Sequence, residues 1–191
     1  MDVVWASLAW PGTEHLVLTV DSGGIRADSL AVHALPDGPP VRVGYTLTTD
    51  DAARTRNVSI EVTASARTER LTLRADGAGA WTDGDGRPIA DLDGCLDVDI
   101  SCTPLTNTFP IRRLGLAVGD SADLEMAYVT LPPLRVRKAG QRYTRLPDGP
   151  DGPVYRYESG TFRADLAVDA DGLVVRYPEL WRRTSDRASA A

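Results

Sequence analysis

The sequence contains no long apolar run, and its first residues carry an acid where an export signal would carry a base. No stretch approaches the ~20 consecutive apolar residues that a membrane-spanning helix needs. Asp2 follows the first methionine, and no apolar core of a signal peptide comes after it. We therefore expect a protein of the cytoplasm that does not insert stably into a membrane.

Histidine and cysteine are scarce, which removes most metal and nucleophile chemistry. The chain has two residues of each type, and none stands in a spaced ligand set. Cys95 and Cys102 are an odd number of positions apart, so one strand would place them on opposite faces, and we expect two buried thiols. The Asp-Gly repeat at 83–86 has turn chemistry but lacks the closing Glu of a calcium loop. No nucleophile elbow, phosphate loop or dinucleotide motif is present. We expect no metal and no cofactor.

Positive charge is also in deficit. The formal net charge is −6, and no basic cluster stands out. This balance argues against a nucleic acid as the main partner. An apolar fraction of 42% and a charged fraction of 25% are typical of a globular protein, and 191 residues suit one core. We predict a single β domain over residues 1–183 and a frayed, small and polar tail over residues 184–191.

Amphipathic helices of ten or more residues are absent, and short β-branched runs take their place. These runs alternate apolar and polar residues and are divided by Asp-Gly and proline-rich turns. The spacing predicts an all-β fold, built as a single curled antiparallel sheet or partly open barrel. A sheet of about a dozen strands has to curl to bury its apolar face. Large wrapped sheets of this kind can enclose a ligand.

The stretch from residue 92 to 113 differs from the rest of the chain. It opens on an Asp-Gly turn, alternates apolar residues with Asp97 and Asp99, and then enters a loop bracketed by two prolines. The alternation predicts a strand with both carboxylates on one face, ~7 Å apart. Because a residue before proline avoids the helical region, we expect an extended loop. A hairpin of residues 111–118 with 122–131 is expected to follow.

This stretch carries a resemblance to a known family. The run Leu-Asp-Gly-Cys-Leu-Asp-Val-Asp, followed by Thr-Pro-x-Thr-Asn-Thr-x-Pro-Ile-Arg-Arg, resembles the signature of a bacterial family labelled putative glycolipid-binding. The likeness continues at Gly79-Ala80-Trp81 and at Gln141-Arg142-Tyr143, so it covers nearly the whole chain. It implies a wrapped sheet, or spiral β-roll, like that of the bacterial lipoprotein carriers, and a lipid or glycolipid as the partner.

Neutral polar and aromatic residues are the first candidates for ligand binding. Thr106, Asn107 and Thr108 offer hydroxyls and an amide that match sugar hydroxyls, or that bond nearby backbone in a self-capped turn. Trp81 and Tyr143 can stack on a sugar ring or line an acyl pocket. The alternative for these two rings is a place in the core.

The charged residues of the same stretch allow two interpretations. Arg112 and Arg113 are adjacent, so on a strand only one of them can line the interior. That guanidinium can grip an anionic head group, or it can form an internal salt bridge to Asp97 or Asp99. A further alternative is that the two acids form a solvated polar face, which is what an antiparallel sheet normally shows on its outer side.

We therefore predict a binding module without catalysis. Its apolar concave face would hold the chain of a lipid or glycolipid, with the head group near the proline-bracketed loop. The alternative is a hydrolase-type enzyme acting on a sugar or ester, with Asp97 or Asp99 as general base. A third possibility is a protein-interaction module that uses an exposed strand edge.

Overall fold

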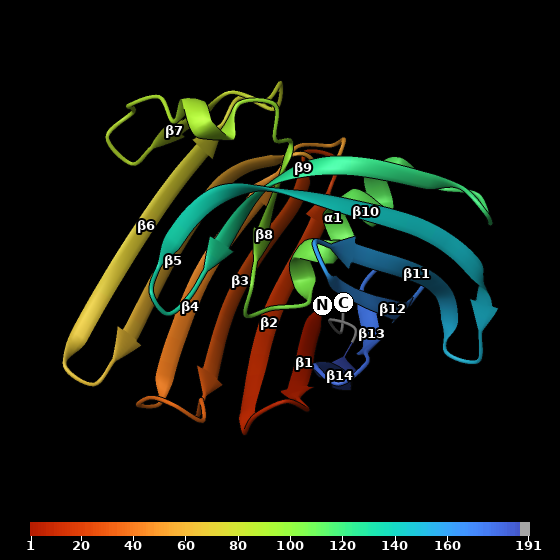
Figure 1. The fold of residues 1–191 in the computed structure, drawn as a ribbon, viewed down its shortest axis with the longest axis horizontal. Helices are drawn as coiled ribbons and strands as arrows, with labels where there is room; N and C mark the ends of the chain where they lie inside the picture. The colour runs from red at the N-terminus through yellow and green to blue at the C-terminus, as the bar shows by residue number, and fades with distance from the viewer. Residues whose placement is uncertain (188–191) are drawn as a thin grey trace.

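The computed structural model describes residues 1–187 and contains one sheet of 14 strands (Figure 1). The strands are β1 (Asp2–Ser7), β2 (Gly12–Asp21), β3 (Gly24–His33), β4 (Val41–Thr49), β5 (Thr55–Ala64), β6 (Arg67–Ala75), β7 (Trp81–Asp83), β8 (Asp97–Ile100), β9 (Ser121–Thr130), β10 (Arg135–Gly149), β11 (Gly152–Ser159), β12 (Phe162–Val168), β13 (Val174–Tyr177) and β14 (Trp181–Arg187). The sheet is curled and its two edges are not paired with each other. The prediction of an all-β curled sheet is confirmed.

The chain starts and ends in the middle of the sheet. Strands β1 and β14 pair with each other, and β2 to β7 follow in sequence to one edge. The chain then crosses to the opposite edge, where β8 begins, and β9 to β14 lead back to the middle. Neighbouring strands are antiparallel except β8 and β9, which are parallel. The predicted antiparallel pairing therefore holds everywhere but at this edge.

Residues 84–120 form the crossing segment, which starts beside β7 and then runs between the two halves of the curled sheet (Figure 1). It contains η1 (Ala90–Leu92), β8, η2 (Leu105–Asn107) and α1 (Thr108–Leu114). Leu105 and Phe109 are fully buried and belong to one apolar cluster with Trp5 of β1 and Leu16 of β2. The crossing segment thus fills the concave side of the sheet. The expectation that the apolar concave face is free to hold a lipid chain is wrong in this region.

Helix α1 replaces the extended loop and the start of the hairpin that the sequence predicts. Pro110 stands in the first turn of the helix, where its missing N–H would have had no helical partner. Gly115 ends the helix with a left-handed conformation (φ 53°), which glycine adopts at little cost. Burial of Phe109 outweighs the preference of a residue before proline for extended backbone. The predicted hairpin of residues 111–118 with 122–131 is therefore wrong.

The last strand and the two cysteines concern the remaining sequence expectations. Strand β14 runs to Arg187, past the predicted domain end at residue 183, and residues 188–191 of the predicted tail lie outside the described residues. Cys95 and Cys102 are both free and buried, as predicted. Burial raises the pKa of the Cys95 thiol to about 11, so it is un-ionised at neutral pH.

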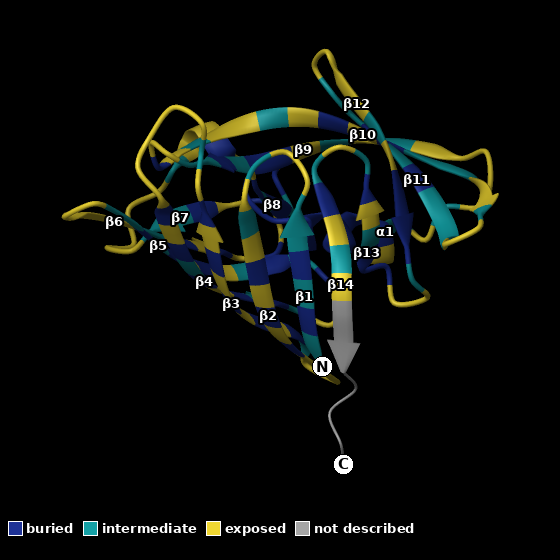
Figure 2. Cartoon of the chain, turned by 90° about the horizontal axis from the view of Figure 1, so that it is seen from below, coloured by how far each residue is buried: buried dark blue, intermediate teal, exposed yellow. Residues whose placement is uncertain are grey.

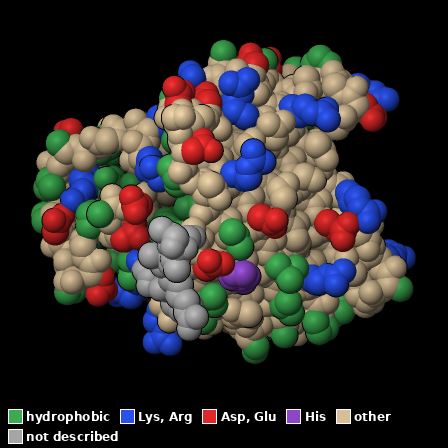
Figure 3. All heavy atoms as spheres, turned by 180° about the vertical axis from the view of Figure 1, so that it is seen from behind, with side chains coloured by type: hydrophobic (Ala, Val, Ile, Leu, Met, Phe, Trp, Pro, Cys, Tyr) green, Lys and Arg blue, Asp and Glu red, His purple; other side chains and the backbone are tan. Residues whose placement is uncertain are grey.

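The surface follows from the strand alternation. Buried and exposed residues alternate along β2, β3 and β4 (Figure 2), with one face on the core and one in water. The face seen in Figure 3 carries basic and acidic side chains interspersed, with no large area of one sign. Among residues 1–187, no helix is long and apolar enough to cross a membrane.

Candidate functional site

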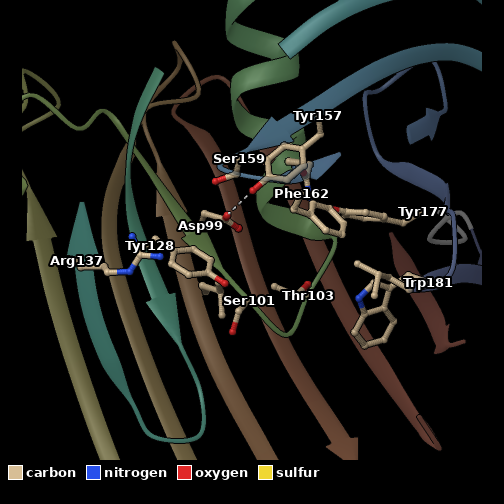
Figure 4. Close-up of a pocket in the computed structure, with 13 residues that line it drawn as sticks. Asp99, Ser101, Thr103, Tyr128, Arg137, Tyr157, Ser159, Phe162, Tyr177 and Trp181 are labelled. Atoms are coloured by element: carbon tan, nitrogen blue, oxygen red, sulfur yellow. Dashed lines mark hydrogen bonds between the residues drawn. The ribbon is translucent and has the colours of Figure 1, made fainter. Parts of the chain in front are cut away.

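A pocket of about 290 Å³ opens beside strand β8, and we call it the Asp99 pocket (Figure 4). This volume is close to the lower end of the ~300–1,000 Å³ range of small-molecule sites. Its polar lining residues are Asp99, Ser101, Thr103, Asn107, Arg137 and Ser159. Its aromatic lining residues are Tyr128, Tyr157, Phe162, Tyr177 and Trp181. The pocket is therefore a mixture of aromatic rings and hydrogen-bonding groups rather than an apolar tunnel.

Strand pairing brings three of these residues into one row. Asp99 of β8 lies opposite Tyr128 of β9, and Tyr128 lies opposite Arg137 of β10. Directly paired residues project from the same face of a sheet, so their side chains are neighbours. The Arg137 guanidinium lies over the Tyr128 ring, 5.0 Å from its centre. This row forms one side of the pocket in Figure 4.

The carboxylate of Asp99 is held by neutral donors. Thr106 Oγ1 donates to Oδ1 at 3.0 Å, while Gln141 Nε2 at 2.5 Å and the Tyr157 hydroxyl at 3.5 Å donate to Oδ2. Burial raises the pKa of Asp99, and the hydrogen bonds from these side chains oppose that rise. No ion pair joins Asp99 to a base within residues 1–187. Its oxygens keep lone pairs that a ligand hydroxyl can use.

Aromatic rings form the opposite side of the pocket. The Tyr157 ring packs against Phe162 and Tyr177, with ring centres 6.0 and 6.4 Å away. Behind it, Tyr143 contacts Tyr157 edge to face at 5.4 Å. Phe162 is 44% exposed, whereas Trp181 is 2% exposed, so the wall runs from the surface into the core. Such rings offer faces on which the C–H groups of a sugar can pack.

A buried glutamate lies behind the pocket wall. Glu14 of β2 has no exposed surface, and its Oε1 accepts hydrogen bonds from Ser29 (2.7 Å), Tyr45 (2.5 Å) and Thr103 (2.9 Å). Burial raises the pKa of Glu14, against the effect of these hydroxyl donors. Thr103 lines the pocket and donates a hydrogen bond to Glu14, so it connects the buried glutamate to the pocket. The sequence indicates this burial, because Glu14, Leu16 and Leu18 alternate along one strand and therefore share its inward face.

Three of the residues predicted for ligand binding, Thr106, Asn107 and Tyr143, lie at or behind the Asp99 pocket, whereas Thr108 lies beside Gly172 of the β12–β13 turn. Asn107 lines the pocket, and Thr106 holds Asp99. Tyr143 is 1% exposed and donates its hydroxyl to Asn107 Oδ1 at 2.8 Å, so it supports the wall from behind. Thr108 is buried in the first turn of α1, and its hydroxyl has no hydrogen-bond partner within the described part of the chain.

The other predicted site residues lie elsewhere. Asp97 is 1% exposed and forms an ion pair with Arg113 of α1, so the internal salt bridge is the interpretation that the structure supports. Arg112 is exposed beside Gly172 of the β12–β13 turn. Trp81 is buried, and its indole N–H donates to the carbonyl of Cys95 at 2.8 Å. On a helix, the two arginines do not take the opposite faces that a strand would give them.

Of the aromatic residues, the sequence prediction chose Trp81 and Tyr143 for ligand binding, and neither lines the Asp99 pocket. The tyrosines at 128, 157 and 177 were visible only as ring residues of separate strands, and Phe162 as a strand residue. Their grouping depends on how the sheet curls. Within residues 1–187, no group of three or more His, Cys, Asp or Glu side chains could hold a metal ion.

Comparison with known proteins places this all-β, pocket-bearing chain in a family. A family model described as "Putative glycolipid-binding" matches residues 2–183, and the chain belongs to that family. A DUF1089 family protein from Pseudomonas aeruginosa, known from a crystal structure, is 39% identical, with a TM-score of 0.80. The alignment covers 90% of this chain and 92% of that one. A search of curated proteins gives no match.

Proposed function

We propose that the protein binds a glycolipid through its sugar head group, in the Asp99 pocket, without catalysing a reaction. The family description supports a glycolipid as the ligand class. The observation that carries the proposal is a carboxylate, fixed by Gln141 and Thr106, facing a wall of aromatic rings. Carboxylates accept hydrogen bonds from sugar hydroxyls, and ring faces pack on sugar C–H groups.

The head group suits this pocket better than an alkyl chain does. An alkyl chain would leave Asp99, Ser159 and Asn107 without water and without new partners, which costs free energy. A neutral sugar supplies both donors and acceptors at short spacing. The acyl part of the ligand therefore belongs outside the Asp99 pocket, and not in the concavity of the sheet, where the crossing segment packs.

The experiment compares the affinity of methyl glycosides for the wild type and for two amide variants. Asp99→Asn keeps the shape but removes the charge, and we expect binding to weaken about 10- to 100-fold, as for loss of a hydrogen bond to a charged group. The matched control is Asp123→Asn, whose carboxylate is 75% exposed and paired with Arg142 on the surface. Isothermal titration calorimetry gives both affinities. Equal affinity in wild type and Asp99→Asn would refute the proposed site.

A hydrolase is the second candidate function, because Asp99 combines a raised pKa with a place in a pocket. Asp97 suits that role less well, because it is paired with Arg113 and does not line the pocket. Glycoside hydrolysis ordinarily uses two carboxyl groups beside the scissile bond. Asp99 is the one acid among the described residues that line the pocket. Release of nitrophenol from nitrophenyl glycosides, lost in Asp99→Asn, would favour the enzyme.

A further inference from the structure

A second pocket, of about 230 Å³, adjoins the first, and we call it the Trp10–His33 pocket. Its wall comes from the turn before β2, the end of β3, the start of β4, the turn after β8 and the residues after β9. Its lining residues include Trp10, His33, Leu35, Ser101, Cys102 and Leu131. This pocket played no part in the sequence prediction.

The two pockets meet at Ser101. This residue lines both of them, and it is exposed, so the ridge between the pockets is open to a ligand. Trp181 lines the Asp99 pocket and packs edge to face against Trp10, with ring centres 6.4 Å apart. It also packs against His33 at 5.6 Å. One molecule that crosses Ser101 would therefore contact both pockets.

The Trp10–His33 pocket is neutral and mostly apolar. The Trp10 indole N–H donates to His33 Nδ1 at 3.0 Å, so the ring proton of neutral His33 is on Nε2. Burial lowers the pKa of His33 and raises that of the Cys102 thiol, so both side chains are uncharged at neutral pH. No Asp, Glu, Lys or Arg of the described chain lines this pocket. Its chemistry contrasts with the carboxylate and guanidinium of its neighbour.

We propose that the Trp10–His33 pocket takes the first carbons of an alkyl or acyl chain whose sugar occupies the Asp99 pocket. The inference rests on the proposed function and makes it more specific, because the ligand becomes an amphipathic glycoside that spans Ser101. A second sugar ring fits less well, since apolar side chains line most of this pocket and would leave most of the ring's hydroxyls without partners; these side chains are Leu35, Val41, Leu131 and Pro132.

The test is a series of β-D-glucosides and β-D-galactosides with methyl, butyl or hexyl groups, titrated into the full chain. We expect affinity to rise about fourfold for each added methylene, which corresponds to ~0.8 kcal/mol, until the pocket is filled. NMR should show a nuclear Overhauser effect between the terminal methyl of the hexyl chain and the indole protons of Trp10. Affinity that is independent of chain length, or a chain with no contact to Trp10, would overturn the inference.

Two variants test whether the gain in affinity comes from this pocket or from nonspecific hydrophobic binding to the surface. Leu35→Trp places a large ring in the pocket wall, and we expect it to abolish the gain from chain length while methyl glycosides bind as before. The matched control, Leu30→Trp, changes a residue of β3 that is 49% exposed, and the gain should persist. An unchanged gain in Leu35→Trp would contradict the inference. The NMR contact in wild type does not depend on how well either variant folds.

The choice of ligand also shows which of the two proposals fails. Methyl glycosides probe the Asp99 pocket alone, and 1-hexanol probes the Trp10–His33 pocket alone. If methyl glycosides bind but longer chains add nothing, the proposed function stands and the second pocket is refuted. If 1-hexanol contacts Trp10 and no glycoside binds, the sugar site is refuted and the apolar pocket stands. If none of the probes binds, both proposals are wrong.

Discussion

Substituting Arg113 should reveal the free-energy cost of burying the Asp97 carboxylate. The side chain of Asp97 is 1% exposed, and that of Arg113 is 16% exposed. Asp97 Oδ1 has no hydrogen-bond partner within the described residues, so Arg113 supplies the main compensation for burying the charge. Arg113→Met keeps a long apolar stem but leaves the carboxylate unpaired. The ion pair also ties β8, which carries Asp99, to α1.

Breaking a buried pair from one side costs ~3–5 kcal/mol at neutral pH, and for a chain of this length that lowers Tm by roughly 6 to 20 °C. Burial already raises the pKa of Asp97, and loss of the Arg113 charge raises it further. A pKa higher in the folded than in the unfolded state means that the folded state binds more protons in between. The destabilisation should therefore shrink as the pH falls toward the ordinary carboxyl range.

The assay is urea unfolding at neutral and at acid pH, with Arg142→Met as the control. The Arg142–Asp123 pair is exposed on both sides, at 47% and 75%, so its loss should cost less than ~1 kcal/mol at either pH. The double variant Asp97→Asn/Arg113→Met should recover part of the lost stability. A cost in Arg113→Met that is as small as in the control, or that does not depend on pH, would refute the reasoning.

Three further outcomes can be measured on the same instruments. Phe109→Ala should cost ~3–5 kcal/mol of unfolding free energy because the ring is fully buried, whereas Phe162→Ala, 44% exposed, should cost about 1 kcal/mol or less; similar costs would contradict the packing of the crossing segment. Burial raises the pKa of Asp99, so the stability of the wild type should fall as the pH rises from the pKa of the unfolded state through that of the folded state. In thermal unfolding, Asp99→Asn should therefore show a weaker dependence of Tm on pH. An equal dependence in both proteins would count against the raised pKa. Tyr45→Phe removes a 2.5 Å donor from buried Glu14 and should cost ~1.5–3 kcal/mol at neutral pH, and a neutral effect in urea unfolding would show that the bond is dispensable.

The sheet was predictable because its signals are local. Alternation along the strands and Asp-Gly turns identify each hairpin, and neighbouring strands pair in sequence order from β1 to β7. The parallel pairing of β8 with β9 has no local signal, because it depends on where the crossing segment ends. Helix α1 is missed for a related reason. The sequence Phe109-Pro110 argues against a helix locally, and only the buried contacts of Phe109 reverse that preference.

The site was predictable in part for the same physical reasons. Thr106 and Asn107 stand out as neutral polar residues in one short segment; in the structure Thr106 donates a hydrogen bond to Asp99, and Asn107 lines the same pocket. Gln141 and Tyr157, which donate hydrogen bonds to Asp99, come from strands that the curl of the sheet brings to β8. No periodicity within one strand contains that information. The cytoplasmic location and the absence of catalysis stay predictions.

The most direct measurement is NMR mapping of a panel of methyl glycosides on the wild-type chain. The account predicts that a binding glycoside shifts the ring signals of Tyr128, Tyr157, Phe162 and Trp181, and that Asp99→Asn weakens those shifts at equal ligand concentration. A panel with no binder, or shifts that cluster away from these rings, would contradict a sugar site beside Asp99.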